Sequence, residues 1–233
     1  MRARRSKRKN VRRLLWRLLL GLFLLSLAPV VLWRFLDPPV TLLMMQRWVE
    51  ASGESRLHYQ WVDYDEVSPR FLLAVVASED QKFPTHHGFD FESIADAVES
   101  AGRGKRLRGA STISQQVAKN VFLWPGRSWL RKGLEAYYTV LIELIWGKRR
   151  ILEVYVNVAE LGPLTFGVEA ASRRAFGVDA AHLSAEQSAL LAAMLPNPLA
   201  RSVHAPGPYV RERQQWIIQQ MNLLGGPAYL RGL

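Results

Sequence analysis

The stretch Ser68–Asp80 reads SPRFLLAVVASED. Its opening Ser-Pro pair is typical of a helix start, because Ser caps helix N-termini and Pro suits the first helical position. The apolar run that follows predicts a helix from Arg70 to about Ser78. Glu79 and Asp80 come at its end. A carboxylate against apolar surface has a raised pKa and can exchange protons near neutral pH, so the pair is a candidate for acid–base chemistry. The alternative is a solvated helix end.

Six later segments carry similar helix signals. Serines in capping positions, or Gly and Pro at the expected ends, mark most of their boundaries. Strand signals are few and no internal repeat is visible. The sequence therefore predicts an all-α or nearly all-α domain of roughly 190 residues. The six helices are expected at about 111–121, 128–147, 149–161, 168–176, 184–195 and 209–224.

Composition limits the function classes. The 233 residues suit one domain with a short appendage, and 49% hydrophobic residues exclude global disorder. The absence of cysteine excludes disulfides, Cys-ligated zinc and thiol catalysis. The net charge of +11 is concentrated at one end: ten of the 31 Lys and Arg residues precede Asp37, the first acidic residue, which leaves 21 basic residues against 20 acidic ones. The domain is nearly neutral, so we expect no nucleic-acid partner.

Residues 14–36 are predicted to cross a membrane. The 16 residues between Arg17 and Arg34 carry no charge, and arginines near the ends can reach the headgroups. Trp16 and Trp33 stand where interfacial aromatics belong, and the preceding basic residues place the N-terminus in the cytoplasm. A cleaved signal peptide is the alternative, but the stretch is long and no clean cleavage site follows it. The predicted segments are a basic cytoplasmic tail (1–13), a transmembrane anchor (14–36), a linker or membrane-proximal segment (37–58) and a helical domain (59–233).

The segment Gly109–Asn120 (GASTISQQVAKN) carries polar residues at helical spacing. If the segment is helical from Ser111, then Ser111, Gln115 and Lys119 share one face. Free backbone N–H groups at the helix start favour an anion. A hydroxyl, an amide and an ammonium on this stripe suit a phosphate or a sugar. The alternative is the ordinary polar face of a surface helix.

A second cationic cluster lies at 127–135. Arg131 and Lys132 stand four and three residues before Glu135, which is either a surface ion-pair ladder or a clamp for a polyanion such as a diphosphate. The adjacent histidines His86 and His87 suggest a metal only weakly, because neighbouring side chains diverge and no third ligand is obvious. Two apolar stretches, 41–45 and 120–129, are expected either to rest on the bilayer or bind a lipid chain, or to pack in the core.

Four ordered motifs make the chain resemble the family 51 glycosyltransferases, which are peptidoglycan glycosyltransferases. The pattern E-D-x-x-F-x-x-H-x-G matches at Glu79–Gly88, and G-x-S-T-I-[ST]-Q-Q-x-x-K-N matches at Gly109–Asn120. R-K-x-x-E matches at Arg131–Glu135, and K-x-x-I-L-E-x-Y-x-N at Lys148–Asn157. Many relatives carry Glu where this chain has Arg150, so no catalytic role is carried over to that position.

The resemblance implies a mainly helical, lysozyme-like domain with a long cleft, preceded here by the single transmembrane helix. It implies that lipid II is polymerised into β-1,4-linked glycan strands, with inversion and release of undecaprenyl diphosphate. Glu79 would be the general base and Glu135 the second carboxylate, orienting cations or a divalent ion. Lys119, Arg127, Arg131 and Lys132 would neutralise the diphosphate. The other residues expected to bind substrate are Asp80, Phe83, His86, Gly88, Ser111, Thr112, Gln115, Gln116 and Asn120.

The resemblance also sets the expected surroundings. The partners would be lipid II, the growing glycan strand, the cytoplasmic membrane and a cell-wall synthesis or division complex, with the domain on the periplasmic or extracellular side. A Mg or Mn ion bridging the diphosphate is expected, without a dedicated protein metal site. Two alternatives stay open at this point: a membrane-bound lytic glycosidase acting on peptidoglycan, and a non-enzymatic cell-wall scaffold.

Overall fold

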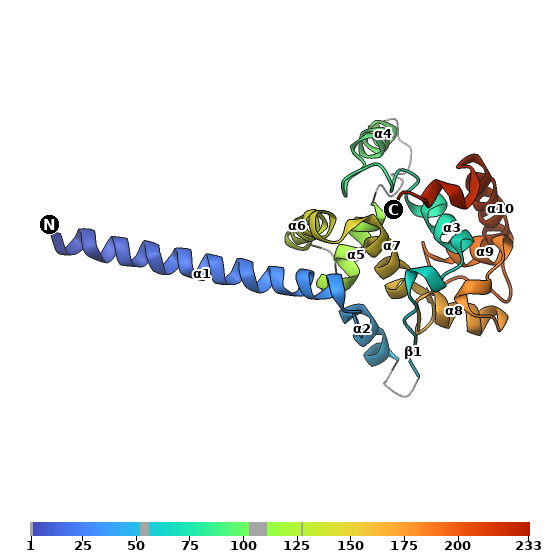
Figure 1. Ribbon diagram of the computed structural model, residues 1–233, viewed down its shortest axis with the longest axis horizontal. Coiled ribbons are helices and arrows are strands. Elements are labelled where there is room, and N and C mark those ends of the chain that lie inside the picture. Colours follow the sequence, from blue (N-terminus) through green and yellow to red (C-terminus); the bar gives the residue numbers. More distant parts are fainter. Residues whose placement is uncertain (1, 52–55, 103–110, 127) are drawn as a thin grey trace. The chain divides into compact units, whose positions relative to one another are not determined.

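The computed structural model describes residues 2–51, 56–102, 111–126 and 128–233, and the chain separates into two compact units, Met1–Asp37 and Pro38–Leu233. The first unit is a single helix, α1 (Arg2–Phe35), drawn in blue in Figure 1. Within it, Arg12–Phe35 is long and apolar enough to cross a membrane, with 24 residues and a mean hydropathy of 2.2 over the window tested. The predicted anchor is thus helical, and the helix continues back through the basic tail.

The second unit is mainly helical, as the sequence predicts. Its first helices are α2 (Leu42–Glu50), α3 (Pro69–Glu79), α4 (Phe91–Gly102), α5 (Ile113–Phe122) and α6 (Trp129–Ile145). They are followed by α7 (Gly147–Val158), α8 (Val168–Phe176), α9 (Ala185–Met194) and α10 (Pro208–Leu223). Short 3₁₀ turns lie at Tyr64–Glu66, Ala180–His182 and Gly226–Leu230.

Helix α3 lies at the centre of this unit. All seven residues from Phe71 to Ala77 are buried. The helix packs against α9 and α10, while α5 packs against α6 and α7. In Figure 1, α9 and α10 lie on one side of α3, and α5, α6 and α7 lie on the other. The buried apolar surface of α3 explains why its end is fixed in space: burying one large aliphatic or aromatic side chain contributes about 1.5–3 kcal/mol.

Three short strands form a small sheet in this unit. Strand β3 (Thr165–Phe166) pairs in parallel with β1 (His58–Tyr59) and antiparallel with β2 (Glu160–Gly162). The fully buried Asn157 ties this region to the segment after β1, because its amide exchanges hydrogen bonds with the backbone N–H and C=O of Val62 at 3.0 and 2.8 Å. The last residue of the fourth motif is therefore a structural crosslink.

The structure corrects several predicted boundaries. Gly147 does not end a helix but starts α7, with φ +76°. The helix expected to reach residue 161 ends at Val158, because the chain then turns into the β2–β3 hairpin. Helices α2 and α4 were not predicted from the sequence. By contrast, α8 ends at a left-handed Gly177, and Ser184 forms the predicted capping box with Gln187 before α9.

Gly167 should be irreplaceable for stability. Its φ is +79°, and a Cβ atom there would lie 2.6 Å from the backbone oxygen of Asn157. Strain and overlap together predict that Gly167→Ala lowers the free energy of unfolding by at least about 2 kcal/mol. The matched control is Gly133→Ala in α6, where a Cβ meets nothing within 4 Å and stabilisation of about 0.5–1 kcal/mol is expected. Thermal unfolding of the full chain in detergent compares the two; equal midpoints would contradict the prediction.

Candidate active site

Glu79, the last residue of α3, is held by a short chain of hydrogen bonds. Its Oε2 accepts a 2.9 Å hydrogen bond from Nε2 of Gln116 in α5. The hydroxyl of the buried Tyr155 donates to Oε1 of Gln116, at 3.2 Å. Burial, with the negative charges of Glu79 and Asp80 nearby, raises the pKa of Tyr155 well above its usual range, so the phenol keeps its proton. Gln116 therefore turns its NH₂ group toward Glu79 and orients the carboxylate.

Asp80 joins the end of α3 to the start of α5. Its Oδ2 accepts hydrogen bonds of 2.9 Å from the backbone N–H of Ile113, the first residue of α5, and from Nε2 of His86. Nδ1 of His86 accepts from the N–H of Gly88 at 3.0 Å, which assigns the ring proton to Nε2. The carboxylate is 3% exposed and the imidazole 7% exposed. This pair therefore fixes the backbone next to Glu79.

The residues Phe83, Gly88 and Thr112 also make their contacts within the protein. Phe83 is fully buried. Gly88 has φ +89°, and a Cβ there would lie 2.8 Å from Cγ2 of Thr139. Thr112 Oγ1 donates to the carbonyl of Gly88 at 2.7 Å and caps the N-terminus of α5. These contacts support the shape of the site, and direct binding of substrate by these residues stays a prediction.

The start of α5 differs from the prediction. The N-cap is Thr112 rather than Ser111, because Thr112 forms a capping box with Gln115: the Thr112 side chain accepts from the Gln115 N–H, and the Gln115 side chain accepts from the Thr112 N–H. Ser111 precedes the helix and does not share a helical face with Lys119. Gln115 is 6% exposed and already serves as a cap. Ser111, Gln115 and Lys119 therefore do not form the predicted polar stripe. Instead, Gln116 and Lys119 line the cleft described next.

A cleft of about 380 Å³ opens beside Gln116; we call it the cationic cleft. Among its lining residues are Gln116, Lys119, Asn120, Trp124 and Arg131. Burial lowers the pKa of Lys119; the charge of Glu135 opposes this shift, and that of Arg131 adds to it. Because its charge is only partly compensated, Lys119 is suited to an anionic ligand.

Glu135 holds the cations of the third motif in place. The carboxylate is 5% exposed and accepts from Lys132 Nζ at 2.5 Å and from Arg131 Nη1 at 3.3 Å. The predicted i, i+3 and i, i+4 pairs are therefore present, with a buried carboxylate at their centre. Removing it would leave Arg131, whose side chain is 12% exposed, without this partner in a poorly solvated position, whereas the half-exposed Lys132 would still reach water.

A second pocket, of about 230 Å³, is lined by Glu79 itself; we call it the polar pocket. Glu79, Lys82, Ser111, Thr112 and Trp216 are among its lining residues. Lys82 is its cation among the described residues, and it is paired with Glu92 and, at 3.9 Å, with Asp90. Glu79 therefore lines a pocket whose polar groups are mainly hydroxyls and carboxylates, and it is hydrogen-bonded to Gln116, which lines the cationic cleft.

The structure also brings together residues that the sequence reading did not connect. Glu143 accepts hydrogen bonds from Ser114 at 2.5 Å and from Lys148 at 2.7 Å. The ammonium of Lys148 lies 4.6 Å above the ring of Phe83 and 3.5 Å from Nδ1 of His86. These residues come from three helices and a loop, so their spacing gives no signal in the sequence.

Arg150 lies apart from this network, and two further positions lie outside the described residues. Arg150, where many relatives carry Glu, pairs with Glu153 at 2.7 Å and stacks over Trp61. Arg127, predicted to bind the diphosphate, lies outside the described residues, as does Gly109 of the second motif.

Comparison with known proteins decides the family. The family model described as Transglycosylase matches residues 46–222, well over half of the chain. The chain belongs to the transglycosylase family. A biosynthetic peptidoglycan transglycosylase of Xanthomonas campestris pv. campestris (strain B100) is 54% identical over 210 residues, covering 88% of this chain and 85% of that protein. One of Xylella fastidiosa (strain M12) is 52% identical over 211 residues, covering 89% and 87%. The predicted family, enzyme class and helical fold of this transglycosylase are thus confirmed.

Asp80→Asn tests the junction between α3 and α5 in this transglycosylase. Nε2 of His86 lies 3.0 and 2.9 Å from the two oxygens of Asp80, so an amide NH₂ in place of either oxygen would face this ring N–H and weaken the charge-assisted contact. We expect a loss of about 1–3 kcal/mol in the free energy of unfolding. The control is Asp63→Asn, at an exposed carboxylate that forms no side-chain cap. Thermal unfolding measures both variants, and the same midpoint for the two would refute the role of Asp80.

Proposed function

We propose how this peptidoglycan transglycosylase works: it joins lipid II units into β-1,4-linked glycan by direct displacement, inverting the donor carbon and releasing undecaprenyl diphosphate. The observation that carries the proposal is that Glu79 lines the polar pocket and accepts a hydrogen bond from Gln116, which lines the cationic cleft. Direct displacement needs a base on one side of the reacting carbon and charge neutralisation on the other. The polar pocket contains the base, Glu79, and the cationic cleft contains the positive charges.

Glu79 is the general base in this proposal. Its Oε2 is engaged by Gln116, whereas among the described residues its Oε1 has only a long 3.4 Å contact, from the hydroxyl of Ser78. That oxygen is available to accept the proton of the acceptor 4-hydroxyl. The base would then act from the polar pocket, where the acceptor sugar binds.

The leaving diphosphate is neutralised from the cationic cleft. Lys119 and Arg131 line it, and Lys132 is held nearby by Glu135. A diphosphate is already a good leaving group, so it requires charge neutralisation more than a proton. Glu135 acts by positioning these cations.

The residues do not fit a dedicated metal site. Both oxygens of Glu135 are occupied by Lys132 and Arg131. The described residues contain no group of three or more His, Cys, Asp or Glu side chains placed to hold an ion. We therefore propose that a Mg or Mn ion, when present, is bound by the diphosphate oxygens and enters with the substrate.

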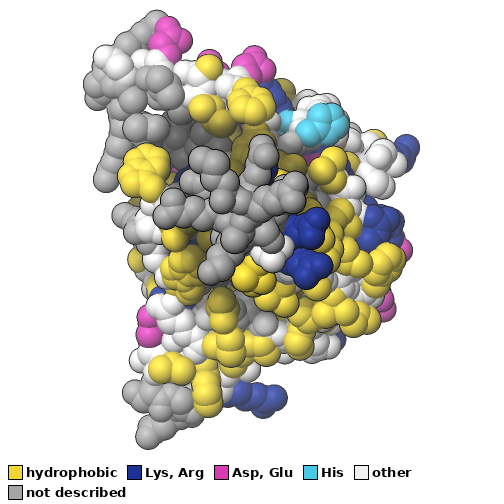
Figure 2. All heavy atoms as spheres, turned by 90° about the vertical axis from the view of Figure 1, so that its left-hand side faces the viewer, with side chains coloured by type: hydrophobic (Ala, Val, Ile, Leu, Met, Phe, Trp, Pro, Cys, Tyr) yellow, Lys and Arg dark blue, Asp and Glu magenta, His cyan; other side chains and the backbone are white. Residues whose placement is uncertain are grey.

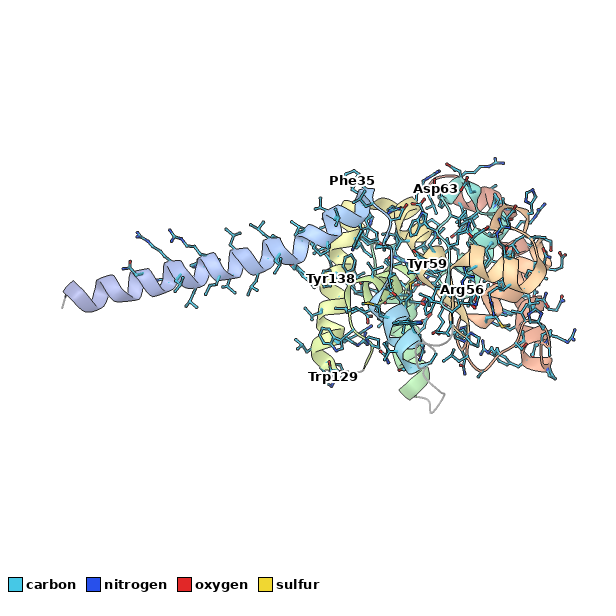
Figure 3. The ribbon with its side chains drawn as sticks, turned by 90° about the horizontal axis from the view of Figure 1, so that it is seen from below. Phe35, Arg56, Tyr59, Asp63, Trp129 and Tyr138 are labelled. Carbon is cyan, nitrogen blue, oxygen red and sulfur yellow. The ribbon has the colours of Figure 1, made fainter. Side chains whose placement is uncertain are left out.

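The membrane context follows from the lipid on the substrate. We propose that α1 anchors the enzyme with its N-terminus in the cytoplasm and its domain on the outer side. Helix α6 leaves Trp129, Leu130 and Leu144 at 92%, 70% and 78% exposure, and Figure 3 shows Trp129 at the end of that helix. Hydrophobic side chains are also widespread on the face shown in Figure 2. Such surface suits the lipid chain or the bilayer. Membership of a cell-wall synthesis or division complex stays a prediction.

Glu79→Gln tests the base. Gln can still accept the hydrogen bond from Gln116 but cannot take a proton, so we expect the rate of glycan polymerisation to fall by about 10²–10⁴-fold with an unchanged unfolding midpoint. The assay is gel separation of the products from labelled lipid II, with Glu66→Gln, an exposed position, as the control. Full activity of Glu79→Gln would overturn the assignment. Shortening of preformed glycan without polymerisation would indicate a lytic glycosidase, and neither activity in the parent protein would indicate a scaffold.

The orientation can be tested because the chain has no cysteine. Single-cysteine variants Asn10→Cys and Asp63→Cys are treated with a membrane-impermeant maleimide in spheroplasts. We expect labelling at position 63, and labelling at position 10 only after permeabilisation. The reverse pattern would contradict the orientation. Loss of residue 10 from the mature protein by mass spectrometry would instead show a cleaved signal peptide.

A further inference from the structure

The C-terminal helix α10 contributes an aromatic wall to the polar pocket. Trp216 lines this pocket together with Glu79 and is 37% exposed. The four motifs end at Asn157, so they do not include this residue.

Helix α10 and the turn after it are tied to the segment that carries Glu79. Arg213 Nη2 donates to the carbonyl of Ser78 at 2.9 Å. The side chain of Gln81 donates to that of Gln220 at 3.1 Å, and the hydroxyl of Tyr229 donates to the carbonyl of Gln81 at 2.7 Å. Three contacts thus bracket positions 78–81. The separation between the indole and the carboxylate is therefore set by the fold.

The indole itself is held by a cation. The guanidinium of Arg213 lies 3.9 Å from the ring centroid of Trp216. Stacking of this kind is worth about 0.5–1 kcal/mol at exposed sites and more where water is excluded. Since Arg213 covers one face of the ring, a ligand in the polar pocket would contact the other face or the edge.

The charges of the polar pocket favour an uncharged, hydroxyl-rich group. Lys82 is paired with acidic side chains, and Asp80 is occupied by Ile113 and His86. The described residues of the pocket thus supply no unpaired cation for a phosphate. A pyranose ring presents hydroxyls at its edge and C–H groups on its face, and a C–H face packs well on an aromatic ring.

We propose that Trp216 is a sugar-binding residue that packs against the acceptor pyranose and so presents its hydroxyl to Glu79. This inference rests on the proposed function, because it assigns the ring that accompanies the base. Trp216 takes no part in proton transfer. Its loss should therefore weaken binding of the acceptor more than it slows the reaction at saturation.

The test separates the acceptor from the donor. A lipid II analogue lacking the 4-hydroxyl can donate but not accept; it carries the label and is held at a fixed, saturating concentration while the full-length enzyme couples it to increasing unlabelled lipid II, and only labelled product is counted. For Trp216→Leu, which keeps apolar bulk without a ring, we expect the acceptor KM to rise about tenfold and kcat to change less than about threefold. Trp216→Phe should restore KM to within about threefold. Leu223→Ala, at a 72% exposed position of the same helix, is the control and should match the parent.

Each outcome bears on one claim. An unchanged acceptor KM in Trp216→Leu, or a Trp216→Phe variant as impaired as Trp216→Leu, would overturn the sugar-binding role. Saturation-transfer NMR with a soluble GlcNAc disaccharide gives a readout without catalysis, and its signal should weaken in Trp216→Leu but persist in Glu79→Gln. If Glu79→Gln remains fully active, the proposed function fails; if only the Trp216 variants behave like the parent, this inference fails alone.

Discussion

The site depends on the two hydrogen bonds that Oδ2 of Asp80 accepts. One comes from Ile113 at the start of α5 and the other from His86 in the loop that follows α3. A helix N-terminus has free N–H groups and a partial positive charge, so a buried carboxylate is well placed there. Because Asp80 adjoins Glu79, this contact also fixes where the Glu79 carboxylate meets Gln116. Loss of the contact would therefore displace Glu79 as well as loosen a helix.

A second constraint is the incomplete compensation of charge in the cationic cleft. Burial lowers the pKa of Lys119, and Arg131 adds to this shift while Glu135 opposes it. A lowered pKa means that the folded protein disfavours the charged ammonium. An anion entering the cleft supplies the missing counter-charge and makes the protonated lysine favourable again. Binding of a diphosphate would therefore stabilise the charged form of Lys119, whereas a neutral leaving group would not.

The sequence predicts helices and motifs well but predicts their contacts poorly. Helix α8, the capping box of α9 and the ion pairs of Glu135 are local features, fixed within four residues, and all are present. By contrast, the contacts of Glu143 with Ser114 and Lys148 join three helices. The N-cap of α5 is Thr112 rather than Ser111 because Thr112 forms a capping box with Gln115, and the contact of Asp80 with the N–H of Ile113 then joins this helix start to α3. The capping box is local, whereas the contact with Asp80 spans 33 positions and gives no signal in the sequence.

The unpaired carbonyl groups at the end of α3 explain why the C-terminal helix α10 lies beside the polar pocket. The carbonyl groups at the end of α3 have no partners within the helix and need donors from elsewhere. The side chain of Gln81 satisfies Ala77, and Arg213 of α10 satisfies Ser78. Satisfying the second carbonyl brings α10 to the position where Trp216 meets the polar pocket. The backbone requirement that ends α3 at Glu79 therefore also brings Trp216 into the pocket that this carboxylate lines, so a change that moves the end of α3 is expected to move the indole as well.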